Sequence, residues 1–290
     1  KASEYRIYKR RLHELGGRMG ELAELKAAAR EAAAELKFDE YESLLRQVDE
    51  SYSEMVVRAK EARARNALLR GRANDAYEGF VSAAETWRSL DHVHSMRKRL
   101  EYHRALFDHG LRFGGSGLER SADILRPTVG AGDYTAQLRA RALQNLANAL
   151  ANISIRSEGP ASLTTMDEAI ERYEEALLLV SIDHDGDVWA MVQQNLGAAL
   201  SLRANWCDDA NERRVFLGRA IEAFRAALRL RPRESKPLEW AMTTQNVAVT
   251  LLEMANVTPG KDGLMLLGRA EKMLPRYPSN GTTSSAMSSA

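Results

Sequence analysis

The sequence predicts an all-α protein that is built as a solenoid of stacked antiparallel helix pairs. Three observations support this fold class. A short helical motif occurs three times at a spacing of about 50 residues, a second helix follows each copy, and no period-two strand pattern interrupts the chain. With 290 residues, 44% hydrophobic content and only 7 prolines, the chain can bury a long helical core.

The repeated motif lies in the first helix of each predicted pair. Its copies are Leu143–Ala147 with Leu150, Gln193–Gly197 with Leu200, and Thr244–Ala248 with Leu251. The second helices carry small and aromatic residues at matching positions: Ala169, Tyr173 and Ala176; Ala220, Phe224 and Ala227; Ala270 and Leu274. Small residues at Ala147, Gly197 and Ala248 allow the paired helices to approach closely. We therefore expect these three positions to be buried.

This pattern resembles the tetratricopeptide repeat, whose signature is W-x2-L-G-x2-Y, then A-x3-F, then P. The second copy matches it at Leu196-Gly197 and at Ala220-x3-Phe224. The C-terminal half resembles a long-period, bacterial-type variant, in which either the connections are enlarged or the helices are longer. The resemblance implies a right-handed superhelix with a concave groove that binds peptides or partner segments.

The N-terminal half shows the pattern at a period of about 35 residues. Ala29, Ala32, Tyr41, Leu45 and Val48 recur as Ala64, Ala67, Ala76, Phe80 and Ala83, and Gly71 lies in a turn. A separate helix is expected near residues 3–15, and a less regular pair across residues 93–125. We predict one continuous solenoid with shorter-period pairs in residues 1–130, long-period pairs in residues 131–278 and a flexible Ser/Thr-rich tail in residues 279–290.

Charge and cysteine usage exclude several classes of protein. The 41 basic and 40 acidic residues alternate along the helices, which does not indicate a polyanionic partner. Cys207 is alone, so an intramolecular disulfide is impossible. We find no membrane-spanning apolar run and no signal peptide, and we expect a cytoplasmic protein. Because the chain starts at Lys1 and not at Met, we expect a fragment of something longer.

No motif in the sequence predicts catalysis, a cofactor or a metal, so we expect a protein that is not an enzyme. His92, His94, His103 and His109 are predicted to be surface histidines because no second ligand type accompanies them at zinc-site spacing. Asp183–Asp187 resembles a calcium loop, but Gln194 occupies the closing position, so a turn between repeats is expected. Gly114–Gly117 lacks the Gly-Lys-Ser/Thr ending of a phosphate loop, and Cys207 has no neighbouring base.

The resemblance implies that one face of each first helix lines the groove. The residues on that face are Arg141, Gln144, Asn145, Asn148, Asn152, Gln194, Asn195, Gln245 and Asn246. Carboxamides suit the recognition of an extended peptide because each can donate to a carbonyl and accept from an N–H. The asparagines could instead bond to neighbouring helices and stabilise stacking, and both interpretations stay open. The glutamines are expected to be exposed in the groove.

Two further pairs of residues recur with the period. Trp189 and Trp240 begin equivalent helices and are predicted to pack between repeats. Met191 and Met242 replace the basic residues of the family's carboxylate clamp, so the binding of an acidic C-terminus is not expected.

The leading functional hypothesis is a non-catalytic scaffold that binds a peptide or protein partner in the groove. The alternative is a sensor or autoregulatory module, whose partner is a protease or nucleotide-hydrolysing domain of the same longer chain. Nucleic-acid binding is disfavoured because the basic clusters have no interleaved aromatics; their residues are Arg58, Lys60, Arg63, Arg65, Arg70, Arg72, Arg97, Lys98 and Arg99. The last repeat lacks a polar capping helix, so we expect further repeats or a second molecule to cover it.

Overall fold

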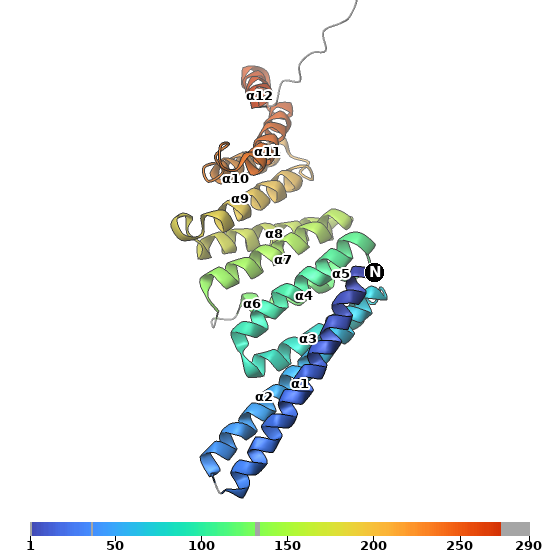
Figure 1. Cartoon of the computed structure of the whole chain (residues 1–290). Coiled ribbons are helices and arrows are strands. Elements are labelled where there is room, and N and C mark those ends of the chain that lie inside the picture. The colour runs from blue at the N-terminus through green and yellow to red at the C-terminus, as the bar shows by residue number, and fades with distance from the viewer. Residues whose placement is uncertain (1, 36, 131–133, 274–290) are drawn as a thin grey trace, which may run out of the picture. The chain divides into compact units, whose positions relative to one another are not determined.

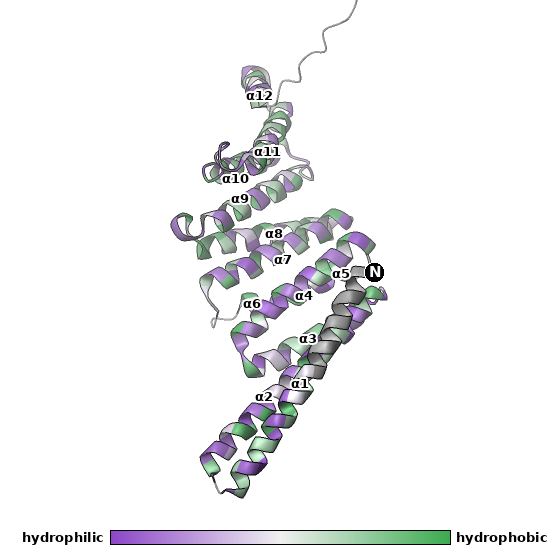
Figure 2. Cartoon of the chain, viewed as in Figure 1, coloured by the Kyte–Doolittle hydropathy of each residue, from purple (hydrophilic) through white to green (hydrophobic). Residues whose placement is uncertain are grey.

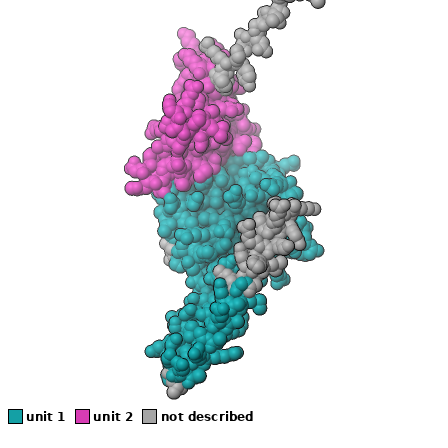
Figure 3. All heavy atoms as spheres, in the orientation of Figure 1, with its two compact units in different colours: residues 1–180 teal, residues 181–290 magenta. Residues whose placement is uncertain are grey.

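The computed structural model describes residues 2–35, 37–130 and 134–273, with side chains at residue 17 and from residue 19 onward. Within these ranges every regular element is an α-helix and no β-strand occurs, which confirms the predicted all-α class. The helices form two compact units, residues 1–180 and residues 181–290 (Figure 3). None of the described helices combines the length and the apolar character that crossing a membrane requires.

The first unit is a series of helices in which each long helix packs against its neighbours in sequence (Figure 1). Its elements are α1 (Ala2–Ala34), α2 (Phe38–Leu69), α3 (Ala73–Leu90), α4 (His92–Phe113), α5 (Gly117–Asp123), α6 (Arg126–Val129), α7 (Ala136–Arg156) and α8 (Pro160–Leu179).

The predicted end of the first helix near residue 15 is wrong, because α1 continues without interruption to Ala34. Its glycines Gly17 and Gly20 disfavour helix only by about 1 kcal/mol each. The surrounding Ala, Leu, Glu and Lys residues are strong helix formers and compensate for them.

The second unit consists, in its described part, of α9 (Ile182–Ala204), α10 (Ala210–Leu228), α11 (Pro237–Asn256) and α12 (Gly260–Met273). Here too, α9 packs on α10, α10 on α11, and α11 on α12. The extra length of the repeat lies in the helices: α9 has 23 residues and α10 has 19. The connections within the pairs are short, at residues 157–159, 205–209 and 257–259. Longer helices, and not enlarged loops, therefore account for the period.

The crossings within the long-period pairs are closely packed, as the motif predicts. Ala147, Gly197 and Ala248 are all buried. A Cβ atom at Gly197 would lie 2.8 Å from the ring of Phe224, so only glycine fits there. The matching positions of the second helices are also buried, namely Ala169, Tyr173, Ala176, Ala220, Phe224, Ala227 and Ala270. Leu274 lies outside the described residues.

The shorter-period prediction holds for most of its positions. Ala29, Ala32, Val48, Ala64, Ala67, Ala76, Phe80 and Ala83 are buried, whereas Tyr41 and Leu45 are half-buried. Gly71 has a φ of 74°, the left-handed conformation that the turn between α2 and α3 requires. Figure 2 shows that hydrophobic and hydrophilic residues share the same helices, as expected when one side of each helix packs on a neighbour.

The division into compact units differs in position from the change of repeat period. Along the sequence, the boundary between the units falls between Val180 and Ser181, whereas the period of the motif lengthens near residue 130. The predicted tail at residues 279–290 lies outside the described residues. The irregular pair predicted across residues 93–125 corresponds to α4 and the short α5.

Candidate functional site

The first of the three motif helices, α7, places its predicted groove residues in different environments. Arg141 is exposed, and Asn145 is half-buried. Gln144 is only 5% exposed, which corrects the expectation that its amide faces an open groove. Because α7 packs against α4, α5 and α6 in addition to α8, more of its circumference is covered than the motif alone indicates.

Asn148 and Asn152 of α7 make contacts within the fold. The Tyr173 hydroxyl of α8 donates to Asn148 Oδ1 at 2.5 Å, and the Asn152 amide donates to the Asn148 carbonyl oxygen at 2.8 Å. Burial raises the pKa of Tyr173, so its hydroxyl keeps the proton that it donates. For Asn148 these bonds favour the stacking role over ligand binding.

In the second unit, Gln194 connects two helices. Its Oε1 lies 3.1 Å from the hydroxyl of Thr243, which is fully buried in α11. The same hydroxyl oxygen accepts a bond of 2.9 Å from Arg231, a buried residue whose pKa is lowered by burial. Asn195 is half-buried beside it. The amide of Gln194 therefore stabilises the packing of α9 on α11.

Helix α11 carries an exposed apolar stripe. Leu238, Met242 and Val249 are 69%, 50% and 44% exposed, and Gln245 between them is also exposed. Their spacing of i, i+4, i+7 and i+11 places all four on one face of the helix. We call Leu238, Met242, Gln245 and Val249 the α11 stripe. Asn246 lies half-buried next to it.

The stripe lies on the side of α11 that the motif assigns to the groove. The residues that pack α11 into the unit, Val247, Ala248 and Leu251, are buried and project from the other side of the helix. On α9, Met191 occupies the motif position of Met242 and is 42% exposed. Apolar side chains in this arrangement can bind the apolar face of another helix or of an extended segment.

Sequence reasoning found part of this surface. Gln245 and Asn246 were predicted, and Met191 and Met242 were noted only as replacements for basic residues. Leu238 and Val249 were missed. The signal that identifies them is their apolar character four residues before and seven residues after Met242, on a face that the buried motif residues do not use.

The four histidines lie in different environments: His92 is exposed, His94 and His109 are half-buried, and His103 is buried. His103 is 4% exposed, and its Nδ1 lies 2.9 Å from the Ser121 carbonyl oxygen, so the expected surface position is wrong for this residue. Burial lowers the pKa of His103, which keeps the ring neutral. Among the described residues, no group of three or more His, Cys, Asp or Glu has a geometry that could hold a metal ion.

The acidic segment Asp183–Asp187 contains the kink of α9, where Asp185 has a non-helical φ of −127° and ψ of 31°. The segment lies in the first turns of this helix, which starts after the cap Ser181. Trp189 and Trp240 are half-buried, and the Arg233 guanidinium lies 5.1 Å from the Trp240 ring centre. Their packing between repeats stays a prediction.

Four members of the predicted basic clusters, Lys60, Arg72, Lys98 and Arg99, make hydrogen bonds or ion pairs within the protein. Arg99 is 5% exposed and donates to the Ile124 carbonyl oxygen and to Glu85. Lys60 donates to Thr86 at 2.9 Å. These contacts leave fewer cations for the phosphates of a nucleic acid.

No protein-family model matches the chain, and no curated protein matches it. Among solved structures, BtubC (BKLC) from P. vanneervenii is similar, with a TM-score of 0.42 and 16% sequence identity. The match covers 94% of this chain and 98% of that chain. At this score and identity the likeness carries no argument about function.

Proposed function

We propose that this chain is a non-catalytic interaction module that binds a peptide or protein segment. The α11 stripe is the observation that supports the proposal most directly. Three large apolar side chains are exposed on one helix face, although Val247, Ala248 and Leu251 on the other side of the same helix are buried. Contiguous exposed apolar surface of this kind marks binding sites in folded proteins.

The partner chemistry follows from the composition of the stripe. Leu238, Met242 and Val249 favour a segment that presents apolar side chains, and methionine adapts its shape to different partners. The exposed amide of Gln245 can bond to a backbone group of the bound segment. The resemblance of the repeat motif to the tetratricopeptide family agrees with this use of the surface.

The same surface also suits the alternative of an autoregulatory module, in which the bound segment belongs to another domain of a longer chain. We place the protein in the cytoplasm of a bacterium, as the lone thiol and the resemblance suggest. We expect no turnover of hydrolase or transferase substrates by the purified chain.

The proposal is tested with a double variant, Leu238→Glu with Met242→Glu. A matched control is Val215→Glu on α10, which changes a side chain that is also exposed, at 60%. Proteins captured by the three forms are identified by mass spectrometry, and the dissociation constant is then measured with the purified partner. We expect the wild type and the control to bind and the double variant to lose binding, with unchanged helix content in all three. Equal binding by the three forms would refute the proposed surface.

A further inference from the structure

The outer side of α12 carries a second surface, separate from the α11 stripe. Helix α12 packs on α11 (Figure 1), and its buried residues Gly263 and Ala270 lie on one side of the helix. The opposite side carries four residues at successive spacings of three, four and three positions, which places them along one line of a helix. We call these residues the α12 ridge: Lys261, Leu264, Gly268 and Glu271.

The middle of the α12 ridge consists of a large apolar side chain and an opening. Leu264 is 69% exposed. No atom of the described residues lies within 4 Å of a Cβ built at Gly268, so the surface is open one turn further along the helix. A side chain next to an opening at this spacing is the arrangement with which two helices interlock in a coiled coil.

The preceding second helix, α10, binds a helix on the same face. Arg214 and Gly218 occupy the positions in α10 that Leu264 and Gly268 occupy in α12, one period later. Arg214 donates to the C-cap carbonyl oxygen of α11 at 2.6 Å, and the Met254 methyl group of α11 lies 3.7 Å from a Cβ built at Gly218. This face of the repeat is therefore one on which a helix packs, and in α12 its residues are exposed.

The charges at the ends of the α12 ridge select the occupant. Lys261 lies three residues before Leu264, and Glu271 lies three residues after Gly268; both are exposed. When two copies of α12 align antiparallel about a two-fold axis, Lys261 of each copy meets Glu271 of the other, and Leu264 of each meets Gly268 of the other. The ridge is thus complementary to itself in both charge and shape, which favours a second copy of the chain over an unrelated helix.

We propose that the chain forms a homodimer through antiparallel pairing of two α12 ridges. Each Leu264 fills the opening at Gly268 of the other copy, and Met265, which is 61% exposed, adds apolar contact beside it. Two ion pairs between Lys261 and Glu271 lie at the ends of the interface. One helix from each copy gives an area at the small end of specific interfaces, so the dimer is reversible, with a dissociation constant in about the micromolar range.

Sedimentation velocity over a range of protein concentrations tests the proposal. We expect the wild type to shift from a monomer of 32.3 kDa to a species of twice that mass as the concentration rises. Lys261→Glu and Glu271→Lys each bring like charges together in a homodimer, and each should weaken self-association by roughly tenfold or more. The control is Leu238→Glu with Met242→Glu, which changes the α11 stripe and should dimerise like the wild type, so this test is independent of the proposed function.

Mixing the two charge variants gives the sharpest test. In a mixed dimer of the Lys261→Glu chain and the Glu271→Lys chain, opposite charges meet again at both ends, so the mixture should associate although neither variant does so alone. Gly268→Leu should also weaken the dimer, because it fills the opening that receives Leu264, while the helix content stays unchanged. A wild type that stays monomeric at submillimolar concentration, unchanged association of the charge variants, a monomeric mixture, or loss of the dimer in the α11 control would each overturn the proposal.

Discussion

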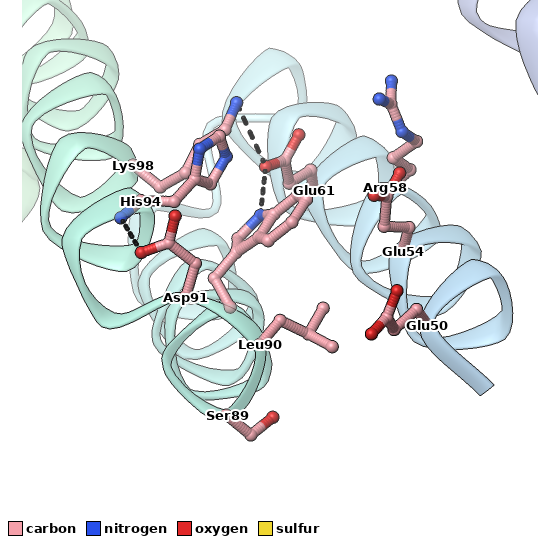
Figure 4. A pocket seen from close by; sticks show the side chains of 10 residues that line it. Glu50, Glu54, Arg58, Glu61, Ser89, Leu90, Asp91, His94 and Lys98 are labelled. Carbon is pink, nitrogen blue, oxygen red and sulfur yellow. Dashed lines mark hydrogen bonds and ion pairs between the residues drawn. The ribbon is translucent and has the colours of Figure 1, made fainter. Parts of the chain in front are cut away.

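Glu61 illustrates, at the scale of one residue, how the helical core accommodates a charge. It is 7% exposed and borders a cavity of about 740 Å³ between α2, the end of α3 and the start of α4 (Figure 4). Tyr102, which donates to this carboxylate, is itself fully buried, and its ring stacks on Phe80 with ring centres 4.5 Å apart. A buried charge is tolerated only when partners replace the water that it has lost. Tyr102, Trp87 and Lys98 supply those partners, and they come from two helices other than that of Glu61. Burial alone would raise the pKa of Glu61, but these partners outweigh it and lower the pKa.

The first prediction concerns the pH dependence of stability through Glu61. Because the pKa of this group is lowered in the folded state, its charge contributes stability above the unfolded pKa. That contribution is lost as the pH falls from about 4.5 through the folded pKa. We expect Glu61→Gln to cost about 1–3 kcal/mol at neutral pH in urea unfolding, and less as the solution is acidified. The exposed control Glu42→Gln should show neither effect, and a cost for Glu61→Gln that is independent of pH would contradict the assignment.

The second prediction concerns the helix crossing at Gly197. A side chain added there meets the Phe224 ring, so Gly197→Leu should overpack the crossing and cost roughly 1–3 kcal/mol. Gly20→Leu is the matched control, because no atom lies within 4 Å of a Cβ built at that helical glycine. Thermal melts of both variants should show a loss for the first alone. A melting temperature unchanged in Gly197→Leu would contradict the close packing.

At the scale of the helix, equivalent positions of one motif acquire different roles. Gln144, Gln194 and Gln245 occupy the same motif position, yet they are buried, half-buried and exposed respectively. The local sequence around each is similar, so the difference comes from the neighbouring helices. Gln194 meets Thr243 of α11, whereas Gln245 projects from α11 into solvent.

The third prediction distinguishes the structural role of the Gln194 amide from the exposed position of the Gln245 amide. Gln194→Ala removes one of the two acceptors near the buried Thr243 hydroxyl, which can still donate to the Glu239 carbonyl oxygen, and should cost about 1 kcal/mol or less of unfolding free energy. Gln245→Ala should change stability by less than about 0.5 kcal/mol, because the side chain is exposed. If Gln245 contacts a partner, its variant should instead weaken partner binding. Equal destabilisation by the two substitutions would show that both amides are structural.

At the scale of the whole molecule, acidic and basic residues are nearly equal in number, and several of them form ion pairs within and between helices. Arg72 lies 3.1 Å from Asp75, and Arg126 lies 2.6 Å from Glu168. Apolar surface also remains on α12, where Leu264 and Met265 are 69% and 61% exposed. We still predict that further repeats or a second molecule cover this end, and the pairing of two α12 ridges is the form of this cover that we propose.

The fourth prediction follows from this distribution of charge. We expect no binding of mixed-sequence duplex DNA or single-stranded RNA in mobility-shift assays at physiological salt. Non-specific binding requires several cations that can release counterions from phosphates, and Lys60, Lys98 and Arg99 are bonded within the protein. Binding that falls steeply with salt and is lost in Arg63→Gln with Arg70→Gln would reverse this conclusion.

The sequence by itself determined the fold class, the pairing of helices and the small residues at their crossings. These features depend on local periodicity, because residues three or four apart share one face of a helix. The burial of Ala147, Gly197 and Ala248 follows from that periodicity.

Only the tertiary structure decided which members of the repeated pattern face solvent and which bond to other helices. It buried Gln144 and His103, left Leu238 and Val249 exposed, and assembled the cavity around Glu61 from three helices. The physical reason is that burial and pairing depend on side chains from elements distant in sequence. Tyr102 is 41 residues from Glu61, and Thr243 is 49 residues from Gln194. A motif that describes one helix at a time contains no information about such neighbours.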